Sequence, residues 1–323
     1  MILIALIFFS FYFNKPIVSD KTIFIPKGST FSIISHLNKK GFDVNFFDVF
    51  ILKIIGEPQS GWIDLKQTHI TKLDFLYKLT SSKAAMKSLL LVPGETYFFF
   101  LHNVAKELNL SHDKLLKNYK KYSKREDGNI LAETYNLPVG MNEEKTIKYM
   151  IGYTDKKYKD LSQKIFGDYD EKKWFSYITV ASIIQKEAAN NKEMAIVASV
   201  IYNRLAKRMP LQMDGTLNYG KFSHTKVTPQ MIDNDTSSYN TYKKYGLPKN
   251  PVCAVSLDAI KAAIFPAQTP YIYFVKSGQN NHHTFSVDFD QHKKNIKSNV
   301  KIEPKSSEKF STKKIDIKEI WEQ

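Results

Sequence analysis

The sequence predicts an α+β fold. Apolar, β-rich runs such as residues 21–26 are interleaved with segments whose apolar residues recur at helical spacing, such as residues 31–39. The chain has 323 residues, enough for about two domains. Hydrophobic residues make up 43% and aromatic residues 13% of the chain, a composition that excludes a disordered protein.

The first 13 residues, MILIALIFFSFYF, are uncharged and almost wholly apolar. As a helix they would span about 20 Å, against a bilayer hydrocarbon core of roughly 30 Å. One interpretation is a buried N-terminal element. The favoured one is an export signal or single-pass membrane anchor over residues 1–20 that begins upstream of Met1, because the basic residues that normally precede such a segment are absent.

Residues 21–85 are predicted to form a small α+β subdomain. It opens with a strand at residues 21–26, followed by Ser29 and its neighbours as the N-cap of a helix over residues 31–39. The remaining predicted elements are a helix at 46–55, a strand at 61–65 and a helix at 72–80.

Residues 86–300 are predicted to form a larger α+β domain, and residues 301–323 a charged tail with a short helix near 315–321. A strand at 87–92 and a helix at 97–108 open this domain in the same strand–Pro/Gly–helix manner as the first subdomain, a weak internal repeat. The other predicted elements are a basic helix at 114–125, helices at 174–188, 192–208 and 254–265, and a central-type strand at 271–276.

The long segment 209–251 is rich in Gly, Pro, Asn and Ser and is predicted to contain little regular structure. Loops of this length in compact domains are usually functional.

Glu187 is the first candidate catalytic residue. It lies near the end of a predicted helix, and Ile183, Ile184 and Val180 share its face. Apolar surroundings and the negative end of a helix dipole both raise a carboxyl pKa, as a general acid near neutral pH requires. The alternative is a solvated glutamate at a fraying helix end.

Two polar clusters lie in the long loop segment. They combine amides, hydroxyls and aromatic rings with few charges, a composition suited to binding sugars. Ordinary turn chemistry explains the same composition equally well. The first cluster comprises Gln212, Asp214, Thr216, Asn218 and Tyr219, and the second is SSYNTY at residues 237–242.

No metal or cofactor site is predicted. His282, His283 and His292 do not have the spacing of a helical metal motif, and Cys253 is the single cysteine. The sequence contains no nucleophile elbow, Walker loop or dinucleotide fingerprint.

The chain closely resembles the endolytic murein transglycosylases, also described as the YceG-like family, over residues 21–300. The resemblance rests on several motifs in the same order: ASIIQKEA, VASVIYNRL, LQMDGTLNYG, YNTY, GLP, YIYFV and HHTFS. IFIPKGST resembles the start of the family's LysM-like subdomain, here residues 21–85. DGNILAETYNLP, residues 127–138, resembles a segment that lines the family's catalytic cleft.

The resemblance implies a single-pass inner-membrane protein whose catalytic domain cleaves peptidoglycan strands internally in the periplasm. Protonated Glu187 would donate to the glycosidic oxygen between MurNAc and GlcNAc, and its carboxylate would then accept the proton of the sugar's C6 hydroxyl. The product would be a 1,6-anhydroMurNAc end, formed without a cofactor. The residues expected to bind substrate or to orient Glu187 are Gln212, Asp214, Thr216, Tyr219, Asn240, Thr241, Tyr242, Glu133, Tyr135 and His283.

The chain departs from the family pattern at several positions. Gln185 stands where many members carry a second glutamate, so it cannot share the acid/base role. Gly215 and Ala132 replace common prolines, and residues 249–250 are Lys-Asn rather than Pro-Gly. An ordinary glycosidase would need a second carboxylate roughly 5–10 Å away, for which Asp214 and Glu133 are the candidates.

Two other functions compete with the lyase. One is a non-catalytic peptidoglycan-binding scaffold. The other is a nucleic-acid binder, which only the net charge of +15 suggests, from 47 Lys and Arg against 32 Asp and Glu. Behind a membrane anchor, this charge is better matched to the carboxylates of peptide stems and to anionic lipid, and the family suggests penicillin-binding synthases as further partners.

Overall fold

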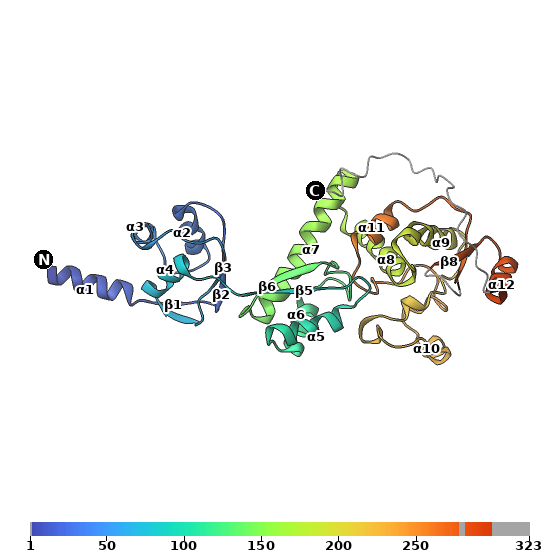
Figure 1. Ribbon diagram of the computed structural model, residues 1–323, viewed down its shortest axis with the longest axis horizontal. Coiled ribbons are helices and arrows are strands. Elements are labelled where there is room, and N and C mark those ends of the chain that lie inside the picture. The colour runs from blue at the N-terminus through green and yellow to red at the C-terminus, as the bar shows by residue number, and fades with distance from the viewer. Residues whose placement is uncertain (1, 278–281, 299–323) are drawn as a thin grey trace. The chain divides into compact units, whose positions relative to one another are not determined.

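The computed structural model describes residues 2–277 and 282–298, in which helices and strands form two compact units (Figure 1). The N-terminal unit comprises residues 1–89, 104–114 and 135–146. The C-terminal unit comprises residues 90–103, 115–134 and 147–323. The α+β class is confirmed, whereas the predicted domain boundaries stay predictions, and the predicted tail and its short helix lie outside the described residues.

The N-terminal unit packs short helices on two antiparallel strand pairs. Strands β1 and β4 form one pair, and β2 and β3 form the other. Its core is aliphatic, with Ile25, Leu52 and Ile63 fully buried. Its elements are α1 (Ile2–Phe13), β1 (Pro16–Val18), β2 (Thr22–Ile25), α2 (Thr30–Lys39), α3 (Phe46–Ile55), β3 (Gly61–Asp64), β4 (His69–Thr71) and α4 (Lys72–Ser81).

Capping residues determine where these helices begin. The Ser29 side chain accepts a hydrogen bond from the Ser32 N–H and so caps α2, as predicted. Asn45 and Asp48 form a reciprocal capping box at the start of α3, which has the predicted bounds. The short strands β1 and β4 were not predicted, because three residues give too brief an apolar pattern.

Helix α1 covers most of the apolar N-terminal segment. In the part of the chain that the structure describes, no helix has both the length and the apolar character that crossing a bilayer requires. The membrane anchor and the LysM-like assignment of residues 21–85 therefore stay predictions.

The middle of the chain contains a further strand pair and two helices. Strand β5 (Met86–Leu90) pairs with β6 (Thr134–Pro138), and α5 (Tyr97–Leu108) has the predicted bounds. Helix α6 (His112–Tyr122) covers most of the basic stretch that was predicted to be helical.

The core of the C-terminal unit is built around α8 (Glu171–Glu187), with α9 (Met194–Ala206) and α11 (Leu257–Ile264) packed against it. Asp170 caps the start of α8 by accepting from the Lys173 N–H. Helix α8 is buried on several sides, and Ile178, Ile183 and Ile184 have no exposed surface. Helix α7 (Glu143–Phe166) was not predicted, and its Gly, Thr and Tyr residues weaken the helical signal.

The long segment 209–251 contains little regular structure, as predicted: two 3₁₀ turns, η2 (Asp214–Thr216) and η3 (Gly220–Phe222), and the short α10 (Pro229–Asn234). The strand predicted at 271–276 is present at residues 273–276, but the prediction that it is a central strand is wrong. Among the described residues, β7 (Tyr273–Lys276) pairs with β8 (His283–Ser286) alone in an antiparallel hairpin. Its apolar side chains pack instead on aromatic rings of β8 and of α12 (Phe289–Ser298).

Candidate functional site

Glu187 is the last residue of α8, where the chain leaves the core of the C-terminal unit. Ala188 follows in an extended conformation and ends the helix. The carboxylate of Glu187 turns toward the long loop segment and accepts a hydrogen bond from the Gly215 N–H at 2.8 Å. The core packing of α8 therefore fixes the backbone that carries Glu187, while the loop fixes its side chain.

Gly215 is tightly enclosed by the end of α8. A Cβ at this position would lie 2.5 Å from the Lys186 Cβ and 2.7 Å from Glu187 Oε1. These separations are shorter than contacts between real atoms allow, so glycine permits the close approach of the loop to Glu187. Unlike proline, which lacks an N–H, glycine at this position supplies a backbone donor to the carboxylate.

Arg204 on α9 holds two of the segments that surround Glu187. Its Nε donates to the Ile272 carbonyl at 2.7 Å, and its Nη1 donates to the Leu211 carbonyl at 2.6 Å. The guanidinium is largely buried and binds both backbone segments at once. It therefore ties the start of the 211–216 loop to the start of the β7–β8 hairpin.

These segments enclose a pocket of about 360 Å³ beside Glu187. Asp214 lies in it and accepts a hydrogen bond from the Tyr242 hydroxyl at 2.7 Å. The rest of the lining is largely aromatic and combines ring faces with amide and carboxylate groups, as sugar recognition requires. The lining residues are Glu187, Arg204, Leu211, Gln212, Met213, Asp214, Tyr242, Tyr273, Phe274, Phe289 and His292.

Burial raises the pKa of Glu187 from its ordinary value of 4.5 to about 7. The negative charge of Asp214 raises this pKa further, whereas the Gly215 N–H and the Arg204 guanidinium lower it. The predicted direction is confirmed, with desolvation as its main cause. A carboxyl group with a pKa near neutrality can donate a proton and later accept one.

Three of the predicted substrate-binding residues are buried within the loops. Thr216, Asn240 and Thr241 have no exposed surface. The Thr241 hydroxyl accepts from the Met213 N–H at 3.1 Å, and the Asn240 amide donates to the Ile232 and Asp235 carbonyls. The Thr216 and Thr241 side chains hold the 212–216 loop against the 240–242 loop, whereas Asn240 fastens the latter to residues 232–235. None of the three lines the pocket.

The other residues predicted to bind substrate lie in different parts of the molecule. Gln212, Asp214 and Tyr242 line the pocket with Glu187, whereas Tyr219 lines a second pocket described below. Glu133 accepts hydrogen bonds from Tyr153 and Lys157 and is outside the lining. Tyr135 is buried on β6 in the N-terminal unit.

His283 does not line the pocket but contacts a residue that does. Its backbone N–H and its Nδ1 contact the two carboxylate oxygens of Glu193, at 2.7 and 2.9 Å. Its ring also packs edge-on against Phe274, which lines the pocket. His283 therefore orients the hairpin that supports the pocket wall.

The Gln185 side chain is bonded to the start of another helix. Its side-chain oxygen accepts from the Ser256 hydroxyl at 2.7 Å and from the Ser256 N–H at 3.2 Å. Ser256 is the N-cap residue of α11, so Gln185 fastens α11 to α8.

Sequence reasoning missed several residues of the site. The sequence does contain a signal for Arg204, because an arginine within the largely apolar α9 is buried only when it has hydrogen-bond or ionic partners. Tyr273, Phe274, Phe289 and His292 carry none, since they reach the pocket only through the fold of the hairpin and α12. The described residues include no group of three or more His, Cys, Asp or Glu side chains placed to hold a metal ion.

Residues 23–298, most of the chain, match the sequence profile of the YceG-like family. The chain belongs to the YceG-like family. A crystal structure described as a putative yceG-like protein from Listeria monocytogenes is similar to this YceG-like chain, with a TM-score of 0.54 and 25% sequence identity. The similarity covers 86% of this chain and 99% of the Listeria chain.

Two curated relatives of this YceG-like chain are named endolytic murein transglycosylase. The Bacillus subtilis protein is 37% identical over 118 residues, which are 36% of this chain and 32% of the relative. The protein of Streptococcus pneumoniae strain D39 is 29% identical over 185 residues, 54% of this chain and 32% of the relative. The chain therefore matches about a third of the length of each relative.

Proposed function

We propose that the chain is a lytic transglycosylase that cleaves peptidoglycan strands internally, with Glu187 as its single general acid and base. The observation that carries the proposal is a half-buried carboxyl group with a pKa of about 7, in a pocket lined by aromatic rings. The names of the relatives support the same reaction class.

In the proposed reaction, Glu187 first donates its proton to the glycosidic oxygen between MurNAc and GlcNAc. The bond between this oxygen and C1 of MurNAc breaks, and C1 gains oxocarbenium character. The resulting carboxylate accepts the proton of the C6 hydroxyl of the same sugar as the C6 oxygen bonds to C1. The products are a free GlcNAc hydroxyl and a 1,6-anhydroMurNAc end, and Glu187 is again protonated.

The pocket supplies groups suited to each part of this reaction. A raised pKa keeps a large fraction of Glu187 protonated at neutral pH. The lining includes the aromatic rings of Tyr242 and Phe274, and aromatic rings are groups on which sugar rings can stack. The Gly215 N–H bonds one oxygen of Glu187 and leaves the other for the substrate.

Hydrolysis is the second candidate function, because Asp214 shares the pocket with Glu187. In that reaction Asp214 would act on a water molecule or on the sugar carbon, and the product would be a reducing end. The hydrogen bond from Tyr242 instead suits Asp214 to a supporting role, in which its charge raises the pKa of Glu187.

Product analysis distinguishes these functions. Purified peptidoglycan is incubated with the full chain, and the new ends are analysed by mass spectrometry. A lyase gives anhydro ends, whereas a hydrolase gives ends that incorporate labelled oxygen from water. Glu187→Gln is expected to lower the rate by a factor on the order of 10²–10⁴.

Glu107→Gln is the matched control and is expected to keep full activity, since Glu107 forms an exposed ion pair with Lys87. Equal activity of Glu187→Gln and the unchanged protein would contradict the assignment of Glu187. Tight binding of peptidoglycan without any product would favour the non-catalytic scaffold.

The remaining expectations are part of the same proposal. Peptidoglycan strands are the proposed substrate, and no cofactor is required by the chemistry above. Inner-membrane attachment through residues 1–20, a periplasmic catalytic domain and penicillin-binding synthases as partners follow from the family resemblance.

A further inference from the structure

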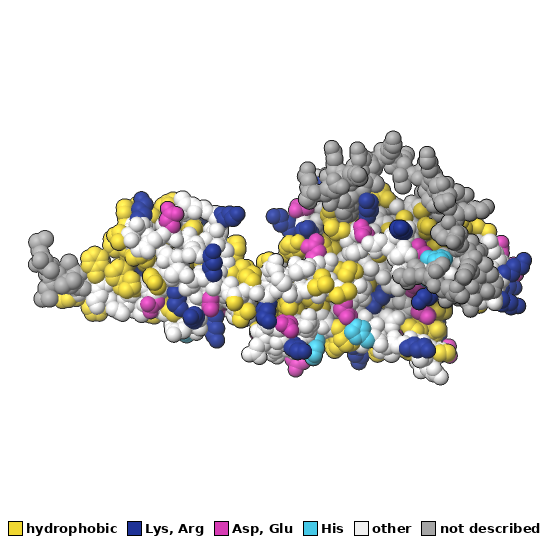
Figure 2. All heavy atoms as spheres, in the orientation of Figure 1, with side chains coloured by type: hydrophobic (Ala, Val, Ile, Leu, Met, Phe, Trp, Pro, Cys, Tyr) yellow, Lys and Arg dark blue, Asp and Glu magenta, His cyan; other side chains and the backbone are white. Residues whose placement is uncertain are grey.

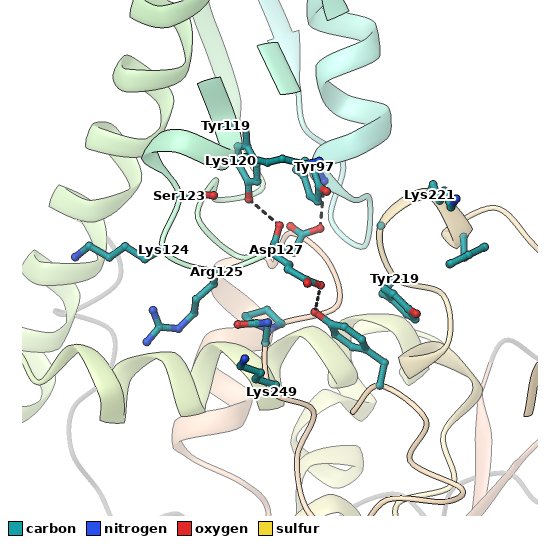
Figure 3. Close-up of a pocket in the computed structure, with 16 residues that line it drawn as sticks. Tyr97, Tyr119, Lys120, Ser123, Lys124, Arg125, Asp127, Tyr219, Lys221 and Lys249 are labelled. Carbon is teal, nitrogen blue, oxygen red and sulfur yellow. Dashed lines mark hydrogen bonds between the residues drawn. The ribbon is translucent and has the colours of Figure 1, made fainter. Parts of the chain in front are cut away.

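A second pocket, of about 600 Å³, lies in the C-terminal unit and shares no lining residue with the pocket beside Glu187 (Figure 3). Five basic side chains contribute to its lining. In Figure 3, Lys124 and Arg125 lie on one side of Asp127, and Lys221 lies on the other. The remaining two are Lys120 and Lys249.

Three of these cations have no carboxylate partner among residues 2–277 and 282–298. Lys124 and Arg125 both pair with Glu171, at 2.7 and 3.4 Å. By contrast, Lys120, Lys221 and Lys249 make no ion pair with any described residue. The pocket therefore holds unpaired positive charge that an anionic ligand could neutralise.

Two stacked pairs of tyrosine rings lie in the walls of this pocket. Tyr97 stacks on Tyr119 with ring centroids 4.3 Å apart, and Tyr219 stacks on Tyr239 at 4.0 Å. The Tyr239 hydroxyl donates to the carboxylate of Glu126 at 2.6 Å.

Asp127 is the buried acidic group of the lining. It accepts hydrogen bonds from the Tyr97 N–H at 3.2 Å and from the Gly128 N–H at 2.8 Å. Burial raises the pKa of Asp127 to about 7, so that its negative charge is only partly developed at neutral pH. Basic groups therefore outweigh acidic groups in the lining.

A short loop segment joins this pocket to Glu187. Gly215 contacts Glu187, and Tyr219, four residues later, lines the second pocket. Four residues span at most about 14 Å between Cα atoms. In addition, Lys186, the neighbour of Glu187, donates to the Ser223 hydroxyl at 2.9 Å. Ser223 lies four residues after Tyr219, so this bond fastens the loop beyond the connecting segment.

We propose that this second pocket binds the carboxylates of an acidic peptide stem carried by the glycan strand that reacts at Glu187. The proposal rests on the proposed function. Peptide stems branch from alternate sugars of peptidoglycan and carry several carboxylates. The Cα atoms of Gly215 and Tyr219 are at most about 14 Å apart, and an extended stem of four residues reaches about 14 Å, so a stem can span this separation.

The test measures binding rather than cleavage. Full-length protein carrying Glu187→Gln is titrated with glycan strands that retain their peptide stems, and with the same strands after an amidase has removed the stems. The pocket variant adds Lys120→Gln, Lys221→Gln and Lys249→Gln. The control variant adds Lys164→Gln, Lys172→Gln and Lys207→Gln, three exposed lysines outside both pockets.

The pocket variant is expected to bind stem-bearing strands about tenfold more weakly, a change of about 1.4 kcal/mol. Binding of the stripped strands should be unchanged, and the control variant should bind both substrates normally. Equal weakening of both substrates, no weakening of either, or the same loss in the control would overturn the proposal.

A phosphate-containing ligand is tested separately. If inorganic phosphate displaces the stem-bearing strands at concentrations at which acetate does not, the pocket recognises phosphate and the proposal is wrong. If the protein with Glu187 unchanged forms no anhydro ends, while stem-bearing strands are still bound preferentially, the proposed function alone is contradicted. Anhydro ends formed by a chain that binds both kinds of strand equally would contradict the pocket assignment alone.

Discussion

Glu187 is balanced between groups that favour its protonated form and groups that favour its carboxylate. Burial and Asp214 raise its pKa, whereas the Gly215 N–H and Arg204 lower it, and the result is a pKa of about 7. Each of these neighbours can be changed separately. The proposed acid/base role can therefore be tested through the pH dependence of the reaction as well as through the loss of activity.

Asp214→Asn is expected to move the pH profile. Because the charge of Asp214 raises the pKa of Glu187, its removal lowers that pKa. Activity that requires protonated Glu187 declines as the pH rises through about 7 in the unchanged protein, and the decline should start at lower pH in the variant. The rate of anhydro-end formation between pH 4 and 9 measures this shift.

Asp233→Asn serves as the control, because Asp233 is exposed and lies outside the pocket lining. Its profile should match that of the unchanged protein. A shift of the Asp214→Asn profile to higher pH would show that Asp214 does not act on Glu187 through its charge.

Gly215→Ala is expected to lower activity. The added Cβ would lie 2.7 Å from Glu187 Oε1 and 2.5 Å from the Lys186 Cβ, so the carboxyl group or the loop must move. A displacement of about 1 Å in a catalytic group can cost 10²-fold in rate. Gly152→Ala is the matched control, since no atom lies within 4 Å of its added Cβ, and it should retain full activity.

Helix α3 shows how burial differs between the faces of one element. Leu52 is fully buried, whereas Phe50 is 49% exposed, although both residues are apolar. Phe46, Phe47 and Ile54 are also exposed, and Figure 2 shows hydrophobic side chains at the surface of the N-terminal unit. The apolar composition of α3 therefore does not by itself determine which residues stabilise the unit.

Leu52→Ala is expected to lower the free energy of unfolding by about 2–5 kcal/mol, because it removes buried methyl groups and leaves a cavity. Phe50→Ala should cost less than about 1 kcal/mol, since it removes only partly exposed contacts with Phe46 and Lys53. Urea unfolding measures both values. Similar losses for the two variants would show that the exposed face of α3 is covered in solution.

The whole molecule is strongly basic, with a net charge of +15. In the C-terminal unit, part of this charge lines the second pocket, where Lys120 comes from the basic stretch at residues 114–125. The charge therefore has a specific candidate partner in the carboxylates of peptide stems. Salt should weaken this interaction, because the lysines involved are exposed.

The dependence of stability on pH provides a prediction for the whole molecule. The pKa of Glu187 is about 7 in the folded protein and near its ordinary value of 4.5 when unfolded. The folded state therefore binds more protons between these values, and the free energy of unfolding falls as the pH rises from 4.5 to 7. Below pH 4.5 both states are protonated, so this group has no effect there.

Glu187→Gln removes this loss of stability. At pH 8 the variant should be more stable than the unchanged protein by on the order of 2 kcal/mol, whereas at pH 4 the two should be nearly equal. Thermal or urea unfolding at both pH values measures the difference, with Glu107→Gln as a control that follows the unchanged protein. An equal effect at pH 4 and pH 8 would exclude ionisation of Glu187 as its cause.

The sequence predicted those elements that are specified by neighbouring residues, through their apolar periodicity or their capping residues. Helices α3 and α5 have the predicted bounds, because a helical apolar pattern specifies each of them locally, and α3 also begins at a capping box. The aliphatic residues on the helix face of Glu187 also predicted the direction of its pKa shift, and this direction is confirmed. The motifs of the chain further identified the family.

Only the tertiary structure decided which distant residues complete the site. Arg204, Tyr273 and His292 reach the pocket because loops and the β7–β8 hairpin fold back on α8 and α9. Thr216, Asn240 and Thr241 were predicted to bind substrate or to orient Glu187, and hydrogen bonds to neighbouring loops bury all three. Polar residues of the same type either face a pocket or fasten a loop, and the choice depends on hydrogen-bond partners that are remote in sequence.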